Sequence, residues 1–406
     1  MPSTPDAPDY PARSDLPEKW SRPQKLAVFG AYSDHDLYQR NRILVELLKE
    51  LSSDFVDIRP PARASLHGLA RGQSLAQSLR QNFKDALYLW SKRRLLDDCD
   101  TVFVPYPAYL GMMLLYFAGR LRGRQIIADA FLEIYSTVVE DRALLSQKSL
   151  GTRVLLFLQR ATLGRADLIF IDTQEQAAQL RARLGHCRAA VMDLPVGIDE
   201  AIWHPLPARP LAANPQQEDC RVLFWGTFIP LHGTDCIAAA ALILERRGEP
   251  IQLRVIGDGQ TAPAFAAALE AQPLHKLSWE RSLVDSATLA EEIADAHMVL
   301  GVFGASAKAA SVVPYKVHQA LACNRPLITR DSPAMTEAGD FDAGLVLCPP
   351  GNPEALADAI AAMTLRLRAG WRANTRAIYE QRFANAVLRE RLACALPLPA
   401  DEVNAC

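Results

Sequence analysis

Short apolar runs alternate with amphipathic stretches along most of the chain. The apolar runs are residues 25–30, 54–58, 101–106, 124–131, 166–173 and 189–197 in the first half, and 221–226, 251–256, 276–280, 297–303, 325–329 and 344–348 in the second. Helical periodicity fills the gaps between them; over 173–185, Thr173 is the expected N-cap and Gly185 the expected end. Strict alternation of strands and helices predicts parallel sheets with helices on both faces.

The alternation stops at residues 204–220, which are rich in proline and alanine and have no periodicity. We therefore predict an α/β fold of two doubly wound Rossmann-like domains joined by a linker. The expected parts are a disordered tail (1–24), a first domain (25–204), the linker (205–219), a second domain (220–374) and a C-terminal helix that packs back across the domains (375–406). The tail has no apolar run of the kind a signal peptide needs.

Composition narrows the class of protein. A net charge of −2 gives no argument for nucleic acid as a partner. Eight cysteines without a Cys-x-x-Cys pair indicate reduced, cytoplasmic thiols rather than disulfides or a zinc site. No apolar run reaches the roughly 18 residues of a membrane-spanning helix.

Residues 59–94 differ from the rest, with eight Lys or Arg against one acid, Asp85. Two readings fit this segment: a solvated helical face, or a patch that rests on anionic lipid or accepts an anionic acceptor. In the second case the cytoplasmic protein would also lie at the inner face of the membrane.

Residues 302–337 contain more features of an anion-binding site than any other stretch of the chain. An apolar run leads into small residues around Gly304, Pro314 then begins a helical run, and a second apolar run follows. Such a strand–loop–helix–strand unit directs the first amides of the helix, and its dipole, towards a natural phosphate site. Lys308 and Lys316 bracket that helix start.

Several stretches also resemble glycosyltransferase family 4, a family of GT-B glycosyltransferases. They occur in the order and spacing of that family: 166–180 (ADLIFIDTQEQAAQL), 194–205 (LPVGIDEAIWHP), 222–243 (VLFWGTFIPLHGTDCIAAAALI), 253–259 (LRVIGDG), 302–337 and 347–360 (LCPPGNPEALADAI). The resemblance implies two domains that face each other across a cleft. It also implies transfer of a sugar from a nucleotide-diphosphate donor, held on the second domain, to an acceptor held on the first. Retention at the anomeric carbon and no metal or other cofactor are expected.

The family's phosphate-binding residues are only partly present. Its first loop has Gly-Arg and then Lys-Gly, where this chain has Gly226-Thr227 and His232-Gly233. Its two glutamates, eight residues apart, correspond to Ser311 and Gln319. His232 is charged only part of the time near neutral pH, and Gln319 can hydrogen-bond but carries no charge.

The resemblance and the residues together give a set of candidate site residues. The catalytic candidates are His232, Lys308 and Lys316, which would stabilise the departing diphosphate, and Asp129, which would orient the acceptor hydroxyl. Further donor-side candidates are Gly226, Thr227, Gly233, Gly257, Asp258, Gly259, Arg281, Gly304, Ser306, Ser311 and Gln319. The acceptor-side candidates are Gly30, Arg40, Arg42 and Glu133. Arg40 and Arg42 flank the first helix and are expected to meet a phosphate on the donor or the acceptor.

Several of these candidate residues also fit a purely structural role. Lys308 also fits a surface lysine, Gly257-Asp258-Gly259 a strand-to-helix turn, and Asp129 a strand-end cap. Asp34-His35-Asp36 fits turn capping better than metal binding. The expected partners are a nucleotide sugar and a glycan, lipid-linked or other glycoconjugate acceptor, in a context such as polysaccharide biosynthesis. A GT-B nucleotide-sugar epimerase and a non-catalytic GT-B scaffold remain alternatives.

Overall fold

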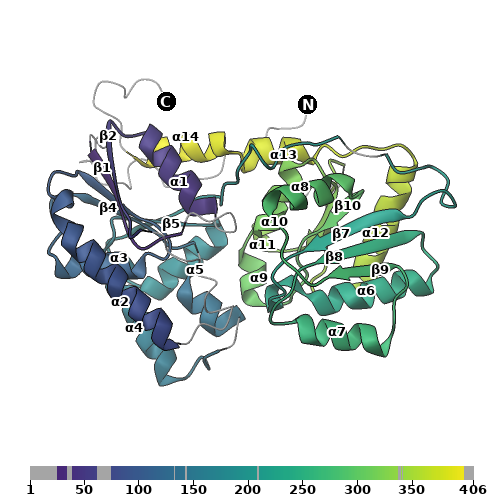
Figure 1. Cartoon of the computed structure of the whole chain (residues 1–406), viewed down its shortest axis with the longest axis horizontal. Helices are drawn as coiled ribbons and strands as arrows, with labels where there is room; N and C mark the ends of the chain where they lie inside the picture. Colours follow the sequence, from purple (N-terminus) through teal and green to yellow (C-terminus); the bar gives the residue numbers. More distant parts are fainter. Residues whose placement is uncertain are drawn as a thin grey trace.

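The computed structural model contains two parallel six-stranded sheets, each flanked by helices (Figure 1). The structure describes residues 25–33, 39–61, 75–131, 133–141, 144–207, 210–336, 340 and 342–396. Asp34-His35-Asp36 and the expected tail lie outside this part of the chain. The predicted fold of two doubly wound α/β domains is confirmed. We call the parts around the two sheets the first and second domains.

The first domain has the strand order β2-β1-β3-β4-β5-β6. Its strands are β1 (Lys25–Phe29), β2 (Asp54–Ile58), β3 (Thr101–Val104), β4 (Gln125–Asp129), β5 (Leu168–Ile171) and β6 (Ala190–Asp193). Its helices are α1 (Gln39–Glu50), α2 (Leu75–Lys92), α3 (Tyr109–Phe117), α4 (Leu150–Thr162) and α5 (Gln174–Leu184), with short turns η4 (Arg93–Leu96), η5 (Ser136–Asp141) and η6 (Leu163–Arg165). Residues of β3, β4 and β5 are buried throughout, as expected for strands covered on both faces.

The second domain has the strand order β12-β11-β10-β7-β8-β9. Its strands are β7 (Cys220–Trp225), β8 (Ile251–Ile256), β9 (Leu277–Glu280), β10 (Met298–Leu300), β11 (Leu327–Arg330) and β12 (Leu345–Cys348). Its helices are η7 (Pro230–His232), α6 (Thr234–Arg246), α7 (Ala262–Ala271), α8 (Ser286–Asp295), α9 (Ala307–Ser311), α10 (Tyr315–Ala322), α11 (Pro333–Thr336) and α12 (Pro353–Arg368). The strand order reverses between β7 and β10, and ligands of such sheets bind at the carboxyl ends of the strands beside this point.

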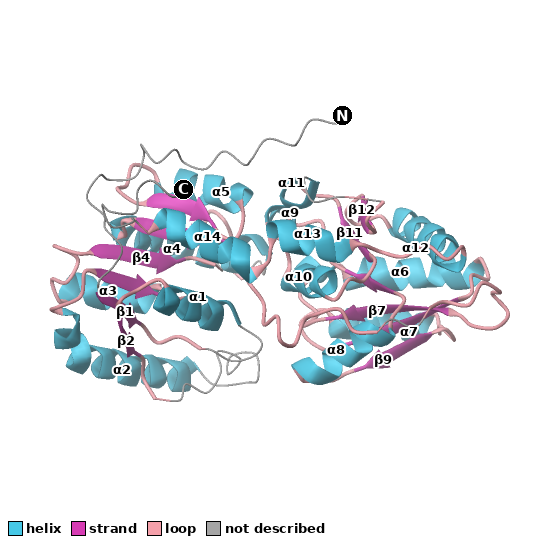
Figure 2. Cartoon of the chain, turned by 90° about the horizontal axis from the view of Figure 1, so that it is seen from above, coloured by secondary structure: helices cyan, strands magenta, loops and turns pink. Residues whose placement is uncertain are grey.

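The C-terminal stretch forms two helices, α13 (Thr375–Arg382) and α14 (Asn385–Ala395), where the sequence pattern suggests one. Glu200 stabilises the break, since its carboxylate accepts hydrogen bonds from the Tyr379 hydroxyl (2.7 Å) and the Asn385 amide (2.9 Å). Helix α13 packs on α10 and α14 packs on α1, so this segment contacts both domains (Figure 2). No helix in the described ranges is long and apolar enough to span a membrane.

Candidate functional site

Two of the expected donor loops meet backbone to backbone at the carboxyl ends of β7 and β8. A Cβ atom on Gly257 would lie 1.8 Å from the carbonyl oxygen of Gly226, and one on Gly259 would lie 1.9 Å from that of Thr227. Both glycines also have positive φ angles, 128° and 156°. No other residue fits at these positions, so the glycines allow the two loops to stack.

The loop after β10 joins the same surface. A Cβ atom on Gly304 would lie 2.5 Å from the Pro230 carbonyl oxygen, and one on Gly233 would lie 2.5 Å from the Gly304 amide nitrogen. The Gly304 amide donates to the Leu231 carbonyl at 3.1 Å. Helix α6 begins beside this contact, and its N-cap, Gly233, has no side chain to occupy the first-turn amides. Such a helix start is a natural anion site.

Lys316 brings its side-chain amine to these loops from α10. Its side chain is 5% exposed, and its Nζ has no hydrogen-bond partner among the described residues. The Nζ atom lies 3.8 Å from the ring centroid of Phe224, and a Cβ atom on Gly226 would lie 3.1 Å from it. Burial lowers the pKa of Lys316 well below its ordinary value. A buried amine without a partner, aimed at a glycine loop, is the expected form of a ligand contact.

His232 and Gln319 complete this cluster. The same Cβ atom on Gly226 would lie 2.5 Å from His232 Cε1, and the His232 ring meets Phe224 edge-on, with centroids 5.7 Å apart. The Gln319 Oε1 atom accepts a hydrogen bond from the Trp225 indole nitrogen at 3.2 Å. The structure therefore brings together Gly226, His232, Lys316 and Gln319, which the sequence places up to 93 residues apart.

Three further candidates lie around this cluster. Thr227 is exposed at the loop that Gly259 contacts. Asp258 accepts a hydrogen bond from the Gly259 amide at 2.8 Å and lies 3.6 Å from Arg281. Arg281 is exposed and rests over the Trp279 ring at 4.8 Å. This placement leaves Arg281 accessible to a ligand above the 257–259 loop.

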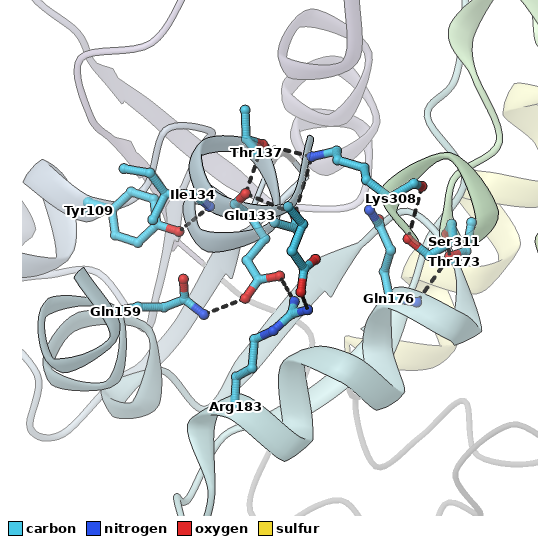
Figure 3. A network of polar contacts seen from close by, with 12 residues as sticks. Tyr109, Glu133, Ile134, Thr137, Gln159, Thr173, Gln176, Arg183, Lys308 and Ser311 are labelled. Carbon is cyan, nitrogen blue, oxygen red and sulfur yellow. Dashed lines mark hydrogen bonds and ion pairs between the residues drawn. The ribbon is translucent and has the colours of Figure 1, made fainter. Parts of the chain in front are cut away.

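Lys308 lies elsewhere, in a short helix that the sequence pattern does not reveal. Helix α9 is capped by Ser306, whose Oγ accepts from the Ala309 amide at 3.2 Å. Lys308 Nζ donates to Ser136 Oγ (3.2 Å) and Thr137 Oγ1 (2.7 Å), both in η5 of the first domain (Figure 3). Lys308 thus joins the two domains. The sequence predicts that Lys308 lies with Lys316 at the start of one helix, facing the diphosphate. In the structure Lys308 instead contacts the first domain.

Ser311, at the end of the same helix, is also part of the domain junction. Its hydroxyl donates to the Lys308 carbonyl at 3.1 Å, and its own carbonyl accepts from the Thr173 hydroxyl. Two residues later, the Val313 amide donates to Asp172 Oδ2 at 3.2 Å. Burial raises the pKa of Asp172 to about 7. Nothing in the sequence pairs Asp172 with Val313, which is 141 residues away.

Asp129 and Arg40 form a buried ion pair in the first domain. Arg40 donates to both Asp129 oxygens at 3.0 to 3.2 Å, and to the carbonyls of Leu194 and Pro195 at 2.8 Å. The two side chains are 2% and 0% exposed. Burial raises the pKa of Asp129, although Arg40 opposes the shift. Asp129 and Arg40 therefore bind each other inside the first domain. The sequence instead predicts that Asp129 orients the acceptor hydroxyl and that Arg40 meets a phosphate.

Glu133 lies in a second buried polar network, drawn in Figure 3. Its carboxylate accepts from Gln159 Nε2 at 2.6 Å and pairs with Arg183, which also pairs with Glu140 at 2.6 Å. Burial raises the pKa of Glu133. The expected acceptor-side carboxylate therefore holds α4 and α5 together through Gln159 and Arg183.

The other acceptor-side candidates make the following contacts within the first domain. Arg42 pairs with Asp199 at 2.7 Å. Gly30, at the end of β1, donates its amide to the Ile58 carbonyl at 3.2 Å. Sequence reasoning also misses Arg330, the last residue of β11. Its buried guanidinium donates to the Gly304 carbonyl and to the Asp331 carbonyl, the latter at 3.1 Å. No group of three or more potential metal-ligating side chains occurs in the described part of the chain.

Comparisons with known proteins agree with the two-domain fold. Residues 219–365 match the model of the family Glycosyl transferases group 1. The sucrose-phosphate synthase of Thermosynechococcus elongatus superposes with a TM-score of 0.63 and 16% identity, over 91% of this chain and 97% of that one. The chain has the GT-B fold.

Two other solved structures share it. Anabaena HepE in complex with UDP-glucose gives a TM-score of 0.63 and 16% identity, over 91% of this chain and 99% of that chain. A glycosyltransferase from Rickettsia africae gives 0.54 and 11% identity, over 92% of this chain and 97% of that chain. No curated protein sequence matches the chain. The matched domain and the GT-B fold together support a GT-B glycosyltransferase.

Proposed function

We propose that the protein is a retaining, metal-independent glycosyltransferase of family 4 type that transfers a sugar from a nucleotide-diphosphate donor. The acceptor is a glycan, a lipid-linked saccharide or another glycoconjugate. The observation that carries the proposal is the Lys316 side-chain amine, buried without a hydrogen-bond partner among the described residues, beside Gly226 and His232. The charged form of such a buried amine is stabilised most by a ligand of negative charge.

The chemistry of the donor suits these groups. In the reaction the bond between the anomeric carbon and the diphosphate oxygen breaks, and a bond from that carbon to the acceptor oxygen forms. The hydroxyl proton of the acceptor leaves with the departing diphosphate. Negative charge that develops on the diphosphate would be stabilised by Lys316, by loop amides and by the start of α6, which supply positive charge without a metal.

The role of Lys316 depends on its protonation. Burial favours the neutral amine in the free protein. A diphosphate next to Nζ favours the ammonium form, so its binding raises the pKa of Lys316 and takes up a proton. Because HepE was solved with UDP and with UDP-glucose, a uridine donor is the first to test.

The test is a thermal-shift panel of UDP, GDP, ADP, dTDP and their sugars on the wild-type protein, Lys316→Met and Lys308→Met. Lys308 is the matched control because it is equally buried but already bonded to the first domain. We expect one nucleotide to stabilise the wild type and Lys308→Met, and to have little effect on Lys316→Met. If no nucleotide stabilises the wild type, the non-catalytic scaffold replaces this proposal. Conversion of the nucleotide sugar without an acceptor would indicate the epimerase.

A further inference from the structure

Helix α4 buries polar side chains and exposes apolar ones, the reverse of what is usual for a helix that packs on a protein core. Its buried residues are polar: Thr152, Gln159 and Thr162. Its outward residues are Leu150, Val154, Phe157 and Leu158, which recur at helical spacing and are at least 48% exposed. Because a helix normally buries its apolar face, this arrangement indicates that something outside the described chain covers it.

Helix α2 presents a similar stripe. Leu79, Phe83, Leu87 and Trp90 follow one another at intervals of four, four and three residues, and Phe83 is 65% exposed. Arg80 and Lys84 are exposed next to this stripe. The buried side of the helix carries Leu89 and Asp85 instead.

Helix α3 connects these two surfaces. It packs against both α2 and α4, and the three helices lie together in the lower left of Figure 1. Met113, Tyr116 and Phe117 of α3 are exposed. We call the exposed apolar residues of α2, α3 and α4 the apolar face.

The segments that build this face are strongly basic. Residues 75–96 carry five Lys or Arg and one acid, residues 109–124 carry three and none, and residues 144–165 carry four and none. The one acid within these three segments is Asp85, which is buried; just beyond the first segment, Asp97 pairs with Arg120 at 2.6 Å. The chain as a whole has a net charge of −2, so positive charge is concentrated around the apolar face.

We propose that the apolar face of α2, α3 and α4 docks on an anionic lipid membrane. Exposed Leu, Phe and Trp side chains would enter the boundary between headgroups and acyl chains, while the neighbouring Lys and Arg side chains contact lipid headgroups. Apolar contact and basic charge together give stable attachment where either alone is marginal. The inference does not depend on the donor site.

A second copy of the chain fits this face less well. A symmetric dimer places the same patch on both subunits, so the basic residues of one copy would meet those of the other. Like charges across an interface oppose association. An anionic lipid surface has the complementary charge and no such penalty.

The sequence suggests a basic patch over 59–94. In the structure, the residues that form the surface differ in part from this segment. Arg63 and Arg71 lie outside the described residues. The described part of that patch contributes the basic side of α2. Helix α2 also contributes four exposed apolar side chains, and the other apolar residues of the face come from α3 and α4, which lie outside 59–94.

The test is co-sedimentation of the full chain with vesicles of phosphatidylcholine, alone or mixed with phosphatidylglycerol, at low and high salt. The variants are Phe83→Ser/Phe157→Ser for the apolar part and Lys84→Glu/Arg153→Glu for the charge. The matched controls are Leu365→Ser and Arg372→Glu, exposed residues of the second domain; Leu365 and Phe157 are both 69% exposed. Circular dichroism checks that each variant is folded.

We expect binding only to vesicles that contain phosphatidylglycerol, weakened by salt. Reversing the charge of Lys84 and Arg153 should weaken it at least about fivefold per side chain, and the double Phe variant should weaken it about tenfold or more. The controls should bind like the wild type. Absence of binding at low salt overturns the proposal. So does a concentration-dependent dimer that Phe157→Ser converts to a monomer, which would assign the face to a second copy.

Discussion

Lys308 and Lys316 lie eight residues apart in one unit of the second domain and are both buried, but their surroundings differ. The Lys308 ammonium group donates to two hydroxyls of the first domain. The Lys316 Nζ atom faces an aromatic ring and a glycine loop, without a hydrogen-bond partner in the described chain. The comparison shows that burial alone does not mark a functional lysine. The buried lysine that has no hydrogen-bond partner among the described residues is the one suited to a ligand.

The largest effect is expected where a partnered buried charge loses its partner. Arg40→Met leaves the Asp129 carboxylate fully buried without its ion-pair partner. We expect a loss of about 3–5 kcal/mol in the free energy of unfolding, measured by urea denaturation. Asp129→Asn should lose less, because the amide is neutral. Equal stability of Arg40→Met and the wild type would show that this pair is not a structural contact.

Lys316→Met tests the other side of the comparison. We expect kcat/KM for sugar transfer to fall about 100-fold or more, since a group that stabilises the departing diphosphate is lost. The thermal midpoint should stay equal or rise, because a buried amine without a partner is replaced by an apolar side chain of similar length. Near wild-type activity would remove Lys316 from the donor site.

Lys308→Met should lower the stability of the protein and leave donor binding almost unchanged, the opposite of Lys316→Met. It removes the donors to Ser136 and Thr137, whose own hydroxyls donate to the Glu133 carbonyl. We expect a loss of about 1–3 kcal/mol in the free energy of unfolding. Donor affinity, measured by calorimetry, should change little. A large loss of donor affinity at unchanged stability would give Lys308 the role proposed for Lys316.

The smallest effect concerns Asp172 and depends on pH. The pKa of Asp172 is raised to about 7, so the folded protein holds a proton there that the unfolded chain loses above about pH 4. Its contribution to stability therefore falls as pH rises from about 4 to about 7. Asp172→Asn should keep the contact with Val313 and raise the thermal midpoint at pH 8 more than at pH 4. The same shift at both pH values would contradict the assignment.

The fold can be predicted well from the sequence because each strand and helix is indicated by neighbouring residues. Runs such as 251–256 are long and apolar enough to predict a strand, and β8 (Ile251–Ile256) has the same bounds. The loop glycines are also predictable, since only glycine tolerates the approach between Gly257 and Gly226. Lys316 follows Pro314 at the start of α10, as its position in the motif suggests.

Contacts between distant segments could not be predicted. Lys308 appears equivalent to Lys316 in sequence, because its partners lie 171 and 172 residues away and α9 is too short to show periodicity. Asp129 looks like an open strand-end carboxylate until Arg40, 89 residues away, occupies it. For α4, the pattern gives an amphipathic helix but does not show that its apolar face points outward.

The central claim is that Lys316 binds the donor diphosphate and becomes protonated as it does so. Calorimetric titration of wild-type, Lys308→Met and Lys316→Met protein with the stabilising nucleotide diphosphate, in buffers of different ionisation enthalpy, measures affinity and proton uptake together. We predict tight binding with net proton uptake for the wild type and Lys308→Met, and at least tenfold weaker binding without that uptake for Lys316→Met. Equal affinity and equal proton uptake in all three proteins would contradict the claim.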